Sequence, residues 1–470
     1  MPSQTVSARA VEPGDELAAA LSAIPEKLGL TRGFPPAVTA EAERIAAIQP
    51  LPELDLTDLE FITIDPVGST DLDQAMCLQT QPDGYRVYYA IADVPAFVEP
   101  GGEVDAEARR RGQTVYAPDG RIPLHPAVLS EGVASLLPGQ LRGAFVWDLE
   151  LDSAANVTAV RVYRARVTSR TQYDYDMAQR LIDTGSGLLL LREIGEKRLH
   201  LEEARGGASL RVPETEVELL EGSYVITRRS PLPVESWNAQ LSLMTGMAAA
   251  SLMLEAGIGI LRTMPEADED AVSRFRNQAK ALGRPWPSTQ RYGDYLRSLD
   301  TDDPRQLAIM HAAASLFRGA GYTAFDGAVP ENTMQAAVAA PYAHVTAPLR
   351  RLVDRFALVL CEAVSAGEAV PEWVREALPE LPSLMSASNS LAGQVDNRAL
   401  DAVEAAMLRG RIGEEFDATV LSSGKGSSTV QLDDPPVTAK SDFPLAAGSR
   451  VRVRLESAEI ATGTVRFSPA

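Results

Sequence analysis

The chain is poor in cysteine and histidine, and this scarcity excludes several kinds of site. The only two cysteines, Cys77 and Cys361, lie far apart and form no CxxC pair. We therefore expect neither a disulfide framework nor a zinc site, which suits a reducing cytoplasm. The four histidines are scattered without HxxxH spacing. The sequence also has no Ser-His-Asp order, no P-loop and no GxGxxG motif that opens a helix after a strand.

Positive charge is scarce as well. The sequence has 44 Lys and Arg against 64 Asp and Glu, which gives a net charge of −20. This balance argues against a general nucleic-acid-binding surface, because such surfaces are usually basic. It still allows a nucleic-acid enzyme whose positive charge is confined to a channel and whose metal ions neutralise phosphate.

The longest apolar segment does not predict a membrane span. The N-terminal stretch MPSQTVSARAVEPGDE lacks the apolar core of a secretory signal. Residues 241–261 are long enough to cross a bilayer, but they contain Glu255 and end in AGIGI, which is typical of a turn into a strand. We therefore predict a helix buried in a large soluble core, no contact with a membrane and a cytoplasmic location.

The pattern of the sequence changes along the chain, which is too long for one hydrophobic core. Residues 1–58 predict a small helical N-terminal domain, with a helix-turn-helix or a plain packing role, that ends in the acidic, proline-rich stretch QPLPELDLTD. From residue 59 onward β-branched and aromatic segments predict strands, and helical patterns dominate after residue 232. Residues 411–470 predict short strands with Gly/Ser turns, the pattern of an OB-fold β-barrel. The predicted fold class is α+β, with several domains.

Three aspartates follow an apolar run in ITIDPVGSTDLDQAM, residues 62–76. Asp71 and Asp73 are two residues apart, so in an extended segment their carboxylates project to one side, and Asp65 lies at the other end of the loop. Converging carboxylates raise one another's pKa, and a hard dication such as Mg²⁺ relieves that conflict. On spacing alone, an acidic surface turn is the simpler interpretation.

Four blocks resemble the ribonuclease II (RNB) family in order and spacing. The aspartate loop is the first, and AIADV, residues 90–94, is the second. Residues 104–136 repeat the family's Arg-Gly, VY-P, IP-P and LS…SL elements, and YAHVTAPLRRLVD, residues 342–354, is similar to its TSPIRRY-D element. The resemblance covers about residues 60–355, and the OB-like tail lies where the family carries one. It implies an RNB-type catalytic domain over residues 59–410, with a mixed sheet and surrounding helices.

The resemblance assigns a metal site to the aspartate loop. Asp65, Asp71 and Asp73 match three of the family's four active-site aspartates, as catalytic residues and metal ligands. Gln74 occupies the fourth position. Its neutral amide can offer a carbonyl oxygen to a cation but adds no charge, which implies a weaker metal site.

Arg350 and two tyrosines are the other residues that the resemblance assigns. Arg350 matches the family's catalytic, RNA-contacting arginine, whose fork suits a phosphate oxygen. The alternative is an arginine that pairs with Asp354 in a helix whose first turn contains Pro348. Tyr116 matches a tyrosine that stacks on the 3′-terminal bases, and Tyr175 matches a second RNA-contacting tyrosine. A core role for Tyr116 is the alternative.

The resemblance implies a hydrolytic 3′-to-5′ exoribonuclease that degrades single-stranded RNA from its 3′ end to 5′-mononucleotides. It implies Mg²⁺, or Mn²⁺ in its place, as the cofactor, and we expect a monomer. Gln74, and Asn238 in place of one glutamate of a family pair, favour an alternative: a catalytically weakened RNA-binding protein of the same fold. A metal-dependent phosphohydrolase of small nucleotides is a third interpretation.

Overall fold

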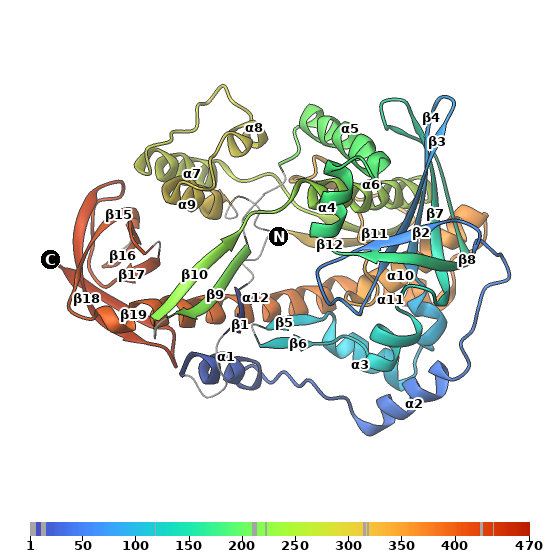
Figure 1. Cartoon of the computed structure of the whole chain (residues 1–470), viewed down its shortest axis with the longest axis horizontal. Helices are drawn as coiled ribbons and strands as arrows, with labels where there is room; N and C mark the ends of the chain where they lie inside the picture. The colour runs from blue at the N-terminus through green and yellow to red at the C-terminus, as the bar shows by residue number, and fades with distance from the viewer. Residues whose placement is uncertain are drawn as a thin grey trace.

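The computed structural model describes most of the chain and mixes helices with strands throughout. The residues that it describes are 6–10, 16–117, 119–208, 214–220, 223–313, 316, 319–423, 426–435 and 437–470. Figure 1 shows a larger body on the right and a smaller C-terminal sheet on the left, joined by one long helix. The predicted α+β class is confirmed.

A closed β-barrel lies on the right side of the larger body (Figure 1). Its strands, in bonding order, are β2 (Phe61–Ile64), β3 (Gln74–Gln81), β4 (Gly84–Ala92), β7 (Leu141–Asp152) and β8 (Val157–Tyr173). Neighbours are antiparallel except β2 and β8, which close the barrel as a parallel pair. The predicted mixed sheet is therefore confirmed.

Alternate residues of β4 and β7 join two different cores, as the period of two in a strand requires. One face contributes Tyr89 and Trp147 to a core shared with α6 (Pro233–Ala256) and α10 (Leu352–Ala366). The other face contributes Ala90 and Val146 to a core shared with α2 (Pro36–Ala46). Both faces of these two strands are therefore covered by other parts of the fold.

The longest apolar segment forms a buried helix and a strand, as predicted. α6 begins at Pro233, where the missing N–H does no harm, and the Glu235 carboxylate accepts the Leu232 N–H at 2.7 Å. The chain then turns at Gly257 into β11 (Ile258–Thr263), which is buried throughout. Across the described residues, the structure contains no helix that combines the length and the apolarity needed to cross a membrane.

The N-terminal segment differs in part from the predicted small helical domain. α1 (Glu16–Lys27) and α2 are helical, but residues 6–10 form strand β1, which pairs in parallel with β9 (Glu214–Leu220) beside β10 (Ser223–Arg229). The helical prediction is therefore wrong for residues 6–10. Leu17 of α1 packs on α12 (Leu381–Leu408), whereas Ala42 of α2 packs beside the barrel. The two helices thus join separate cores, and the boundary at residue 58 stays a prediction.

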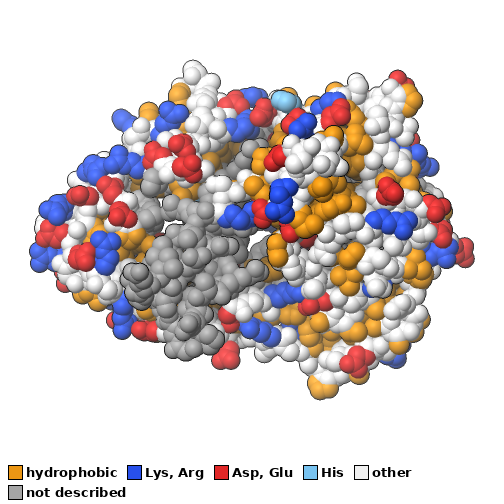
Figure 2. Space-filling view, viewed as in Figure 1, with side chains coloured by type: hydrophobic (Ala, Val, Ile, Leu, Met, Phe, Trp, Pro, Cys, Tyr) orange, Lys and Arg blue, Asp and Glu red, His pale blue; other side chains and the backbone are white. Residues whose placement is uncertain are grey.

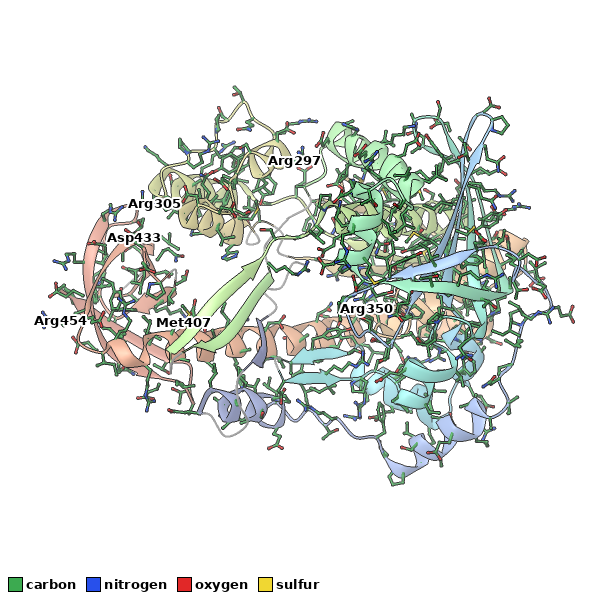
Figure 3. All side chains as sticks on the ribbon, in the orientation of Figure 1. Arg297, Arg305, Arg350, Met407, Asp433 and Arg454 are labelled. Atoms are coloured by element: carbon green, nitrogen blue, oxygen red, sulfur yellow. The ribbon has the colours of Figure 1, made fainter. Side chains whose placement is uncertain are left out.

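The C-terminal strands form a five-stranded sheet in the order β17-β16-β15-β18-β19, which confirms the predicted OB-type barrel. The strands are β15 (Glu415–Ser423), β16 (Ser428–Leu432), β17 (Thr438–Ser441), β18 (Arg450–Glu459) and β19 (Thr464–Pro469). Its core contains Phe416 and Phe467. Arg305 approaches Asp433 of this sheet at 3.9 Å, and Figure 3 shows the two side chains facing each other.

The remaining elements surround the barrel or link it to the C-terminal sheet. They are α3 (Glu103–Arg111), β5 (Val115–Ala117), β6 (Gly120–Ile122), α4 (Tyr175–Asp183), α5 (Leu189–Arg205), α7 (Glu269–Ala281), α8 (Tyr292–Arg297), α9 (Pro304–Ala313), β12 (Gly321–Asp326), β13 (Met334–Gln335), β14 (Ala340–Pro341) and α11 (Glu372–Ala377). α7, α8 and α9 lie between the paired strands β11 and β12 in sequence. They form a lobe beside the C-terminal sheet (Figure 1).

Candidate active site

Two of the predicted aspartates lie at the same end of the barrel because β2 and β3 are antiparallel neighbours. Asp65 directly follows β2, and its N–H donates to the Tyr173 carbonyl at the end of β8, at 3.1 Å. Asp73 directly precedes β3. The loop between them contains Asp71. Figure 3 shows Arg350 near the same end.

Asp73 joins this loop to the segment before α10. The residue is 5% exposed, and its Oδ1 accepts the Leu349 N–H at 2.8 Å. Its Oδ2 lies 3.4 Å from Arg350 Nε. Burial raises the pKa of Asp73 to about 8, although Arg350 and the Leu349 N–H oppose that rise. Asp73 is thus in contact with Leu349 and Arg350, although it is far from both in sequence.

Arg350 lies in a turn and not in a helix, which corrects the predicted helix start near Pro348. α10 begins at Leu352, and the Arg350 N–H donates to the Ala347 carbonyl at 3.2 Å. The carboxylate of Asp354 is taken by Arg351, whose Nε donates to it at 2.9 Å. The ion pair of Asp354 is therefore with Arg351, and Arg350 faces Asp73.

Asp65 and Asp71 have contrasting surroundings. Asp65 Oδ2 is buried without a hydrogen-bond partner among the described residues. Burial raises the pKa of Asp65 to about 6, which Arg350 opposes and Asp71 reinforces. Asp71 instead contacts Arg121 of β6, with Oδ1 2.5 Å from Nη1, and Arg121 also reaches Glu131 at 2.8 Å. Sequence reasoning missed Arg121, because only the β5–β6 pairing brings it to the loop.

Tyr116 lies at the site with its ring outside the core. It is 44% exposed on β5, directly across the ladder from Arg121. Partial burial raises the pKa of its hydroxyl, which Arg350 opposes and Asp71 and Asp73 reinforce. The same charged groups thus act on Tyr116 and on the aspartates. An exposed ring beside them is free to stack on a base.

The sequence also singled out Gln74, Tyr175 and Asn238. The Tyr89 hydroxyl, on buried β4, donates to Gln74 Oε1, so this amide oxygen already has a partner. Tyr175 begins α4, is half-buried against the main core, and its hydroxyl contributes to the raised pKa of Tyr89. Asn238 of α6 donates to the Ile64 carbonyl at 3.3 Å, immediately before Asp65. Tyr89 was missed because its strand position predicted only a core residue.

The carboxylate oxygens of the aspartate loop are the kind of ligand that a hard cation such as Mg²⁺ prefers. Asp65, Asp71 and Asp73 offer carboxylate oxygens; Asp65 has an orphan buried oxygen, and burial raises the pKa of both Asp65 and Asp73. Within the described residues, however, no group of three or more His, Cys, Asp or Glu side chains has the arrangement of a metal site. Arg121 is paired with Asp71, so a cation held by Asp71 would have to share that carboxylate with Arg121.

Two family profiles match the chain. The RNB domain matches residues 53–365, and the RNase II-type exonuclease C-terminal S1 domain matches residues 414–470. The chain is 27% identical over 444 residues to Ribonuclease R of Aquifex aeolicus, an alignment that covers 88% of this chain. The alignment spans only 62% of the length of that relative.

Solved structures share the fold. The apo form of Mycoplasma genitalium RNase R has a TM-score of 0.83 and 19% identity, and covers 97% of this chain and 78% of its own. The same RNase R has been solved in complex with ribose methylated single-stranded RNA, at a TM-score of 0.83, 18% identity and the same coverage. Yeast Ssd1, described as a pseudonuclease, has a TM-score of 0.68 and 17% identity, and covers 94% of this chain and 57% of its own. Because the RNB domain matches more than half of the sequence, the chain belongs to the RNB family.

Proposed function

We propose that this chain is a 3′-to-5′ exoribonuclease that hydrolyses single-stranded RNA to 5′-mononucleotides, as a cytoplasmic monomer. The observation that carries the proposal is the meeting of Asp73 with Arg350 at the barrel end that also holds Asp65, Asp71 and the exposed ring of Tyr116. Acids, a guanidinium fork and a stacking surface are the groups that cleavage of a terminal phosphodiester needs. Family membership and the RNA bound to M. genitalium RNase R support an RNA substrate.

The metal is part of the same proposal. Asp65, Asp71 and Asp73 would hold Mg²⁺, or Mn²⁺ in its place, and Gln74 would add at most a weak ligand because Tyr89 already uses its amide oxygen. When bound, such an ion supplies an activated water and neutralises phosphate charge. Asp65 Oδ2 is buried without a hydrogen-bond partner among the described residues, and this supports the proposal that a cation binds there.

The side chains of the site divide the remaining work. Arg350 donates its fork to the oxygens of the scissile phosphate and stabilises the charge that grows there. Asp73, 3.4 Å from Arg350 Nε, keeps that guanidinium oriented toward the loop. Tyr116 stacks on a base near the 3′ end and so fixes the phosphate at the aspartates. A stacking contact tolerates any base, which suits an enzyme that removes nucleotides in succession.

A catalytically weakened RNA-binding protein is the second candidate function. The hydrogen bond from Tyr89 to Gln74 favours it. Gln74 stands where the family carries an acid, but its side chain is neutral and its amide oxygen already accepts the Tyr89 hydroxyl. The likeness of the fold to Ssd1 shows that the architecture occurs in a protein described as a pseudonuclease.

One experiment separates these candidates. The full chain is incubated with an end-labelled oligoribonucleotide, with Mg²⁺, with Mn²⁺ or with a chelator. Hydrolysis that needs a divalent ion supports the exoribonuclease, and binding without hydrolysis supports the RNA-binding protein. A hydrolase of small nucleotides would show activity that does not rise with substrate length.

A further inference from the structure

A buried arginine near the site has no ionic partner among the described residues. Arg262 of β11 is 8% exposed, and its Nη1 is buried without a hydrogen-bond partner. Not every buried arginine among the described residues is compensated, since Arg198 Nε also lacks a partner, but Arg355 lies 2.5 Å from Asp105. Arg351 likewise lies 2.9 Å from Asp354. Burying a charge is costly unless a partner of opposite sign meets it, so Arg262 requires an explanation.

An aromatic ring holds the Arg262 guanidinium in place. Its Cζ lies 4.7 Å from the centre of the Tyr322 ring, which is directly across the β11–β12 ladder. The Tyr322 hydroxyl is in turn bonded to His344 Nδ1 at 2.7 Å. A cation–π contact satisfies one face of a guanidinium and leaves its in-plane N–H donors for an acceptor. The group is therefore preorganised, with donors to spare.

The same arginine belongs to a cluster of positive charge behind the catalytic turn. The Arg262 N–H donates to the Tyr342 carbonyl at 2.8 Å, and the chain from Tyr342 leads directly to Arg350. Burial lowers the pKa of His344, and the nearby charges of Arg351, Arg262 and Arg350 lower it further, so this histidine adds no positive charge. Asp354 pairs with Arg351 and Asp73 lies against Arg350, which leaves Arg262 as the excess cation.

The chain is acidic overall, so an excess cation on a strand that is hydrogen-bonded to the segment leading to Arg350 is a local exception. Figure 2 shows Lys and Arg interspersed with Asp and Glu on the visible face, without one broad basic area. We propose that Arg262 binds a backbone phosphate of the RNA other than the scissile one, an inference that rests on the proposed function. A phosphodiester supplies the missing negative charge and matches the planar fork of arginine.

The test measures binding and not turnover. A fluorescent oligoribonucleotide is titrated with the full chain in the presence of a chelator, which prevents hydrolysis, over a series of salt concentrations. Loss of one phosphate contact to a single strand should flatten the slope of log K against log salt by about 0.7. Arg262→Gln should show that change and about tenfold weaker binding, whereas Arg262→Lys should keep the slope because it keeps the charge.

Arg276→Gln is the matched control. Arg276 also lies over an aromatic ring, 4.6 Å from the centre of Trp286, and its Nε is also buried without a partner. It belongs to α7, in the lobe beside the C-terminal sheet (Figure 1), and should keep the wild-type slope and affinity. If Arg262→Gln also keeps both, or if the two variants change alike, the inference is wrong.

A second measurement changes the RNA and leaves the protein intact, so it does not depend on the stability of a variant. Single methylphosphonate linkages, which remove one phosphate charge, are scanned along the oligoribonucleotide. A methylphosphonate at one position upstream of the scissile phosphate should lower the affinity of the wild type. The same linkage should lower the affinity of Arg262→Lys by less, because lysine lacks the fork. A wild type indifferent to every upstream linkage would overturn the inference. A wild type that binds no RNA at all would instead overturn the proposed function, and the inference with it.

Discussion

Asp73 makes a structural bond and offers a carboxyl group to Arg350 and to the proposed metal ion, and two substitutions separate these roles. Its Oδ1 accepts the Leu349 N–H at 2.8 Å in a site where the residue is 5% exposed. Asp73→Ala leaves that N–H without its acceptor, and a buried donor without a partner costs about 1–3 kcal/mol. Asp73→Asn keeps a carbonyl oxygen for the same N–H and removes only the carboxylate that faces Arg350.

The two variants should therefore differ in stability and agree in activity. We expect the free energy of unfolding of Asp73→Asn to lie within about 1 kcal/mol of the wild type, and that of Asp73→Ala to fall by about 1–3 kcal/mol. Both should lose about 10²- to 10³-fold in turnover, the usual effect of removing one electrostatic group from an active site. RNA binding by Asp73→Asn should be largely retained. Urea unfolding and single-turnover hydrolysis measure the two quantities.

Asp93→Asn is the matched control for Asp73→Asn. Asp93 is equally buried after β4, accepts the Ala96 N–H at 3.2 Å and lies 3.0 Å from Arg164 Nε. It should keep wild-type turnover, because it lies outside the proposed machinery. Wild-type turnover by Asp73→Asn would refute its assignment, and an Asp73→Asn as unstable as Asp73→Ala would refute the account of the Leu349 bond.

Three further outcomes are expected. Tyr116→Ala should leave longer final oligomers, since stacking is worth about 1–3 kcal/mol per base, while Tyr116→Phe should match the wild type in end-product length; equal damage in both would place the clamp elsewhere. Gln74→Asp should lower the Mg²⁺ concentration for half-maximal rate, and adding Tyr89→Phe should lower it again because the carboxylate is no longer shared; an unchanged requirement would remove position 74 from the metal site. Arg350→Lys keeps the charge but loses the fork, so kcat should fall at least about tenfold with little change in KM, and a normal kcat would contradict its role.

Local sequence patterns were enough to predict several parts of the fold. The buried helix α6, the turn into β11 and the strands of the C-terminal barrel follow from apolar periodicity and from turn residues. The aspartate loop was noticed because Asp65 directly follows an apolar run, but its spacing alone favoured a surface turn, and the family resemblance assigned it as a site. These features depend on neighbours in sequence, which a pattern can report.

The features that sequence reasoning missed depend on distant pairings. Residues 6–10 form a strand because β9 offers a partner, and nothing local indicates this. The turn before α10 was predicted as helix because Pro348 suits a first turn. In the structure, however, the Leu349 N–H donates to Asp73 Oδ1, and the helix begins only at Leu352. Arg121 reaches Asp71 only because β5 and β6 pair as a hairpin.

The most direct test of the central claim is the direction and chemistry of RNA cleavage. An oligoribonucleotide labelled at its 5′ end is incubated with the full chain, and the products are separated by length and identified by mass. The account predicts stepwise shortening from the 3′ end, release of 5′-mononucleotides, and complete dependence on Mg²⁺ or Mn²⁺. Internal fragments, shortening that persists in a chelator, or RNA that stays intact with either ion would contradict it.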